Sequence, residues 1–197
     1  MPDSYSLGAQ RQELQRLGFE ILKTDPHTLI AKRHNFYWDC LLTCVNYTVF
    51  VRSVDCLTPE MMAQERQSFF DQAQRLNPSP LPRGLQSGNA ILVAYLAKRV
   101  TPEAQRICLG APQKYFAQFY LPAVWDHSQG QLFILRQTPY WGRIYFGKFR
   151  YILSHVLLPH QPDSGEPRSQ LGTFLAIAMI LWFGMIFLLI IALMFSA

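Results

Sequence analysis

The stretch NAILVAYLAK, residues 89–98, is almost continuously apolar. A short run of this kind is typical of a strand that is covered on both faces of a sheet. Thr-Pro-Glu follows at residues 101–103 and also stands upstream at residues 58–60. In each case Thr can cap a helix, Pro suits the first helical position, and Glu favours the positive end of the helix dipole. The sequence therefore predicts a central strand between helices over residues 58–76 and 101–109.

Further strands are indicated on both sides of this centre. Residues 19–23 and 28–32 form a predicted hairpin around Asp-Pro-His, and residues 115–125 and 131–137 form another around His-Ser-Gln-Gly. Residues 36–54 are too long for one typical strand, so we expect two strands divided near Val45 and Asn46, or one long bent strand. Amphipathic spacing predicts helices over residues 6–17 and 143–158.

The order of these elements indicates the fold class. Strands precede and alternate with helices, and most neighbouring strands are joined by short turns. We therefore expect one α+β domain over residues 1–158, with a mixed, mostly antiparallel sheet and flanking helices.

Residues 171–197 (LGTFLAIAMILWFGMIFLLIIALMFSA) contain no charged side chain. About 20 such residues suffice to span a bilayer, so this segment predicts a transmembrane anchor and a lipid bilayer as partner. Residues 159–170 (PHQPDSGEPRSQ) are predicted to be a polar tether. The first residues lack the basic and apolar regions of a signal peptide. We therefore expect a tail-anchored, single-pass protein, and the bases that precede the anchor place the domain on the cytoplasmic side.

Aromatic and basic side chains alternate in RQTPYWGRIYFGKFRY, residues 136–151. A core helix with arginine stems lying over apolar surface would produce this pattern, and so would a surface that docks on lipid headgroups or a partner protein. Nucleic acid is a third alternative, but no nucleic acid is expected so close to the bilayer. The candidate docking residues are Arg136, Tyr140, Trp141, Arg143, Lys148 and Arg150.

Residues with catalytic potential are few. The sequence has none of the common nucleotide-binding, hydrolase or zinc-protease motifs, and its four cysteines do not have zinc-finger spacing, so we expect no metal and no cofactor. Arg83, Gly84, Ser87 and Gly88 form either an anion-binding loop or a tight turn. Asp126 precedes a hairpin turn, where aspartate normally binds its own backbone.

Three segments resemble a family of uncharacterised single-span membrane proteins that is common in cyanobacteria. They are LPRGLQSG at residues 81–88, PQKYFAQFYLPAVWD at 112–126 and TPYWGRIY at 138–145. The resemblance extends over about residues 18–158. It implies a thylakoid or plasma membrane location, and it supplies no activity and no catalytic residues.

The sequence thus favours a non-enzymatic accessory or assembly factor that docks on a membrane protein complex. The alternative is a membrane-bound enzyme or small-ligand-binding domain that uses the loop at residues 83–88 together with Asp126.

Overall fold

The computed structural model describes residues 7–37, 43–76, 87–112, 118–140, 142–159, 162 and 165–195. Its elements in chain order are α1 (Gly8–Arg16), β1 (Glu20–Asp25), β2 (Thr28–Tyr37), β3 (Thr43–Leu57), α2 (Pro59–Leu76), β4 (Ser87–Val100), α3 (Pro102–Leu109), β5 (Gln118–Asp126), β6 (Gln131–Phe133), α4 (Arg143–Leu157) and α5 (Gln170–Phe195).

The described strands form one six-stranded sheet in the order β1-β2-β3-β4-β5-β6. The pairs β1/β2, β2/β3 and β5/β6 are antiparallel, whereas β3/β4 and β4/β5 are parallel. Helices α2 and α3 make the two crossovers between parallel strands, as parallel pairing requires. The predicted α+β class with a mixed, mostly antiparallel sheet is confirmed.

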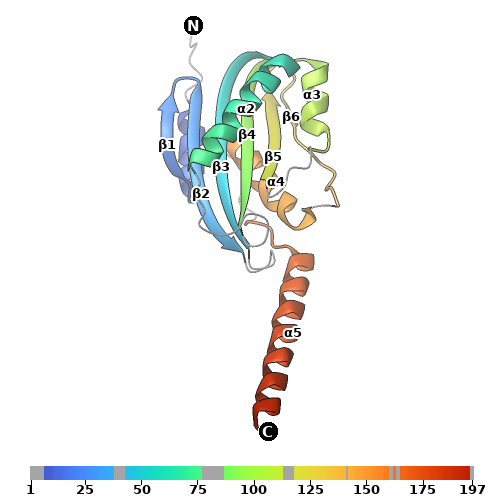
Figure 1. Cartoon of the computed structure of the whole chain (residues 1–197). Coiled ribbons are helices and arrows are strands. Elements are labelled where there is room, and N and C mark those ends of the chain that lie inside the picture. The colour runs from blue at the N-terminus through green and yellow to red at the C-terminus, as the bar shows by residue number, and fades with distance from the viewer. Residues whose placement is uncertain are drawn as a thin grey trace.

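Helices cover both faces of the sheet, and β4 lies near its centre (Figure 1). Alternate residues of β4 enter two separate cores. Leu92 and Ala94 pack in the core beneath α1 and α4, while Val93 and Tyr95 pack in the core beneath α2 and α3. Burial on both faces explains why this strand is apolar without interruption.

The predicted division of residues 36–54 near Val45 and Asn46 is wrong. Strand β2 continues to Tyr37, and β3 then runs unbroken from Thr43 to Leu57. Val45 and Asn46 pair in register with Asn35 and His34 of β2. Hydrogen-bonded pairing between β2 and β3 determines where β2 ends and β3 begins, and the pattern of apolar residues does not indicate that pairing. Strand β6 is also shorter than predicted, since it ends at Phe133.

Helix α5 differs from the other helices because it lies outside the core. Over residues Gln170–Ile191 its mean hydropathy is 2.9, and only 6% of the most apolar part is buried. Figure 1 shows it extending away from the sheet and its covering helices. A core helix would be mostly buried, so α5 is a candidate membrane span, long and apolar enough to cross a bilayer.

Candidate membrane-proximal docking site

Three of the predicted docking residues are exposed just before and at the start of α4. Tyr140 is 96% exposed, and Arg136 and Arg143 are also exposed. Trp141 lies outside the described residues. We call Arg136, Tyr140 and Arg143 the docking surface. An aromatic side chain this exposed, between two arginines, has the composition of a protein interface.

A glycine directs the chain into α4. Gly142 has φ +69°, and the Tyr145 amide donates to its carbonyl at 2.9 Å. A Cβ atom at Gly142 would lie 2.6 Å from Cε1 of Phe119, which is closer than real Cβ contacts. Only glycine fits both the positive φ angle and the limited space beside Phe119. This turn places Arg143 at the first position of α4.

Arg150 has a structural role beneath this surface. Its Nη1 donates to the carbonyl oxygen of Arg136 at 3.2 Å and to Oγ1 of Thr138 at 3.0 Å. Partial burial lowers the pKa of Arg150 from its usual value, because desolvation disfavours the charged form. Arg150 therefore holds the segment before α4 in place, and through it the position of the docking surface.

Lys148 does not belong to an exposed surface, contrary to the prediction. It is 3% exposed, its Nζ donates to the carbonyl oxygen of Pro167 at 2.9 Å, and it lies 4.5 Å from the ring centroid of Tyr37. Phe149 and Ile152, its neighbours on the inner side of α4, are fully buried. The helical period thus turns Lys148 inward, where it binds the segment that leads to α5.

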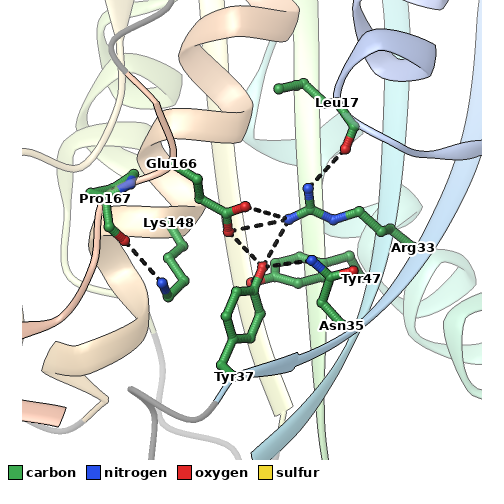
Figure 2. Close-up of polar contacts among 8 residues, drawn as sticks. All are labelled: Leu17, Arg33, Asn35, Tyr37, Tyr47, Lys148, Glu166 and Pro167. Atoms are coloured by element: carbon green, nitrogen blue, oxygen red, sulfur yellow. Dashed lines mark hydrogen bonds and ion pairs between the residues drawn. The ribbon is translucent and has the colours of Figure 1, made fainter. Parts of the chain in front are cut away.

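Glu166 of the same segment is the centre of a polar cluster that sequence reasoning missed (Figure 2). Oε1 of Glu166 accepts from the Tyr37 hydroxyl at 2.5 Å and from Nη2 of Arg33 at 3.2 Å. We call this group the tether clamp: Arg33 and Tyr37 of β2, Lys148 of α4, and Glu166 and Pro167 of the segment before α5. It joins residues up to 133 positions apart in the sequence.

The clamp is largely shielded from solvent. The side chain of Arg33 is 9% exposed and that of Glu166 is 24% exposed. Arg33 also donates to the Leu17 carbonyl at 2.8 Å, and its guanidinium lies over the rings of Phe19 and Tyr47 at 4.8 and 5.0 Å. Cation–π contacts of this kind gain strength when water is excluded.

Burial also sets the protonation of the clamp tyrosine. Desolvation raises the pKa of Tyr37 to about 12, and its hydrogen bond to Glu166 acts in the same direction, while Arg33 opposes it. Tyr37 is therefore neutral at physiological pH and can donate to the carboxylate. It also accepts hydrogen bonds from Arg33 at 2.9 Å and from the Tyr47 hydroxyl at 3.2 Å.

The clamp changes the description of residues 159–170, which were predicted to be a polar tether. Glu166 and Pro167 are bound to the domain, and the Gly172 amide donates to Oγ of Ser169 at 3.0 Å, so Ser169 caps α5. Arg168 alone separates the clamp from the helix cap. Helix α5 is therefore attached closely to the domain.

The described residues of the alternative site lie far apart. Ser87 and Gly88 begin β4 and pair with Cys44 and Val45, while Arg83 and Gly84 lie outside the described residues. Asp126 ends β5 opposite Ala97, nine residues after Gly88 on β4, so roughly 30 Å separates the two places.

Asp126 instead has the predicted turn role. Its Oδ1 accepts from the backbone amide of Ser128 at 2.9 Å and from the Ser128 hydroxyl at 2.7 Å. Within the part of the chain that the structure describes, no three His, Cys, Asp or Glu residues are grouped so that they could hold a metal ion. Comparison with protein-family models and with curated proteins finds no match to this chain.

Proposed function

We propose that this chain is a tail-anchored, single-pass membrane protein whose α+β domain faces the cytoplasm. Helix α5 supplies the anchor. Five basic and two acidic residues between 136 and 168 precede it, and such an excess of bases favours the cytoplasmic side. The resemblance of three segments to a cyanobacterial membrane protein family supports a thylakoid or plasma membrane.

We further propose that the domain is a non-enzymatic accessory or assembly factor that docks on a membrane protein complex. The docking surface carries this proposal, because Tyr140 is almost fully exposed between Arg136 and Arg143. The first turns of α4 also lie against the segment that leads to α5, since Gly147 is adjacent to the ring of Pro167. A membrane partner with an acidic surface beside the bilayer would fit this position and charge.

The test is native electrophoresis of gently solubilised membranes that contain the full chain. We expect the wild-type chain to migrate in an assembly much larger than its own 22.8 kDa. Combined substitution of Tyr140→Ala and Arg143→Glu should release the chain from the assembly, because it removes the exposed aromatic side chain and reverses one charge of the docking surface. Both side chains are exposed, so their replacement leaves the core intact.

Arg99→Glu is the control, because Arg99 is another exposed arginine, near the C-terminal end of β4 and outside the docking surface. This variant should stay in the assembly. Migration of the wild-type chain as a free species, or equal release by Arg99→Glu, would contradict docking through this surface.

A further inference from the structure

A hollow lies between α4 and the segment that precedes α5. Its volume is about 630 Å³, within the range of small-ligand sites in proteins. Arg150, Ser154 and His155 line it from α4, and Glu166 and Arg168 line it from the opposite wall. Two arginines thus border one space from two different segments.

Among the described residues, the acidic side chain on this wall is already bound within the domain. Glu166 binds Arg33 and Tyr37 in the tether clamp. The His155 ring has its own acidic neighbour, since its Nδ1 lies 3.2 Å from Oε1 of Glu13. Arg168 and the Ser154 hydroxyl are therefore suited to an incoming anion, and so are the guanidinium nitrogens of Arg150 other than Nη1, which donates to Arg136 and Thr138.

The position of the hollow indicates where that anion comes from. The candidate span Gln170–Ile191 has 22 residues and would cover about 33 Å, which is the full thickness of a hydrocarbon core. Gln170 would then lie at the edge of the core, and Arg168, two residues before it, in the headgroup layer. Gly147 lies against Pro167, so the hollow opens beside the same layer.

We propose that this hollow binds the phosphate headgroup of an anionic phospholipid. Arg150 and Arg168 would contact the phosphate oxygens from opposite sides, and Ser154 would donate a hydrogen bond. The tether clamp holds the wall with Arg168 in place before the lipid arrives, which lowers the cost of ordering on binding. This inference rests on the proposed membrane location.

The experiment is native mass spectrometry of the full chain in a zwitterionic detergent, titrated with phosphatidylglycerol or phosphatidylcholine. We expect tighter retention of phosphatidylglycerol. Arg168→Gln should weaken that retention about fivefold, as expected for the loss of one juxtamembrane arginine, while Arg99→Gln should leave it unchanged. Arg168 is exposed, so its substitution should not disturb folding.

Equal retention of the two lipids, or equal effects of Arg168→Gln and Arg99→Gln, would overturn the proposal. Competition by millimolar sn-glycerol 3-phosphate would also overturn it, since the hollow would then take a free phosphate compound. Alkaline extraction of membranes tests the location separately. A chain that resists extraction but shows no lipid preference would refute this site and leave the proposed anchoring intact.

Discussion

Replacement of Glu166 by alanine tests whether the tether clamp stabilises the domain. The substitution removes a carboxylate that accepts from Tyr37 at 2.5 Å and from Arg33 at 3.2 and 3.3 Å. The Arg33 guanidinium then stays buried without its counter-charge. It keeps its bond to the Leu17 carbonyl and its contacts with two aromatic rings.

The expected loss follows from the burial of the two partners. Breaking a fully buried ion pair costs about 3–5 kcal/mol, and a hydrogen bond to a charged group contributes about 1.5–3 kcal/mol. Glu166 is 24% exposed and Arg33 retains other partners, so we expect about 2–3 kcal/mol for Glu166→Ala. Glu166→Gln should cost about half as much, because its amide oxygen still accepts hydrogen bonds. For a domain of this size, the alanine variant should lower Tm by roughly 5–10 °C.

The assay is thermal unfolding of the full chain in mild detergent, followed by circular dichroism, together with trypsin cleavage after Arg168. Cleavage should accelerate in Glu166→Ala because the segment leaves the domain more often. Glu20→Ala is the control, since Glu20 also has a partner, Lys32 at 3.3 Å, but is 66% exposed. If Glu166→Ala lowers Tm no more than Glu20→Ala and leaves cleavage unchanged, the clamp is not a stabilising contact.

Two other perturbations follow from the same region. The pKa of Tyr37 is raised to about 12 in the folded state from about 10 when unfolded, so its contribution is fully present below pH 10 and is lost as pH rises toward 12. Tyr37→Phe should therefore reduce the fall in unfolding free energy between pH 10 and 12, measured by urea denaturation at several pH values. Gly142→Ala should destabilise the fold by about 2 kcal/mol or more, because it adds a contact with Phe119 to a strained backbone. Gly130→Ala, at φ +60° with no atom within 4 Å of the added Cβ, should cost about half as much in the same measurement.

Much of the fold could be predicted because its signals are local. The β4 segment is apolar on both faces, and Thr101 caps α3 by accepting from the Ala104 amide at 3.3 Å, as Thr-Pro-Glu predicts. The boundary between β2 and β3 could not be predicted in this way. Val45 and Asn46 differ in polarity, yet both belong to one ladder whose register depends on residues 35 and 34.

The candidate site shows the same difference between residues marked by local sequence and residues whose partners are distant in sequence. Arg136, Tyr140 and Arg143 are close in sequence, and their aromatic and basic character marked them as candidates. Periodicity alone did not separate exposed Arg143 from buried Lys148, because the partner of Lys148 is a carbonyl oxygen 19 residues away. Nothing local to Glu166 indicates that Arg33 and Tyr37 lie opposite it.

The tether clamp has a geometric consequence for docking. A free tether of 12 residues would have an end-to-end distance of about 19 Å and would let the domain turn in any direction above the bilayer. With Pro167 held by Lys148 and α5 capped at Ser169, only Arg168 is left between the domain and the helix. The backbone between Pro167 and Ser169 extends over at most about 7 Å. Under the proposed function, this short link keeps the docking surface at Tyr140 and Arg143 in one orientation relative to the bilayer, in which a membrane partner meets it.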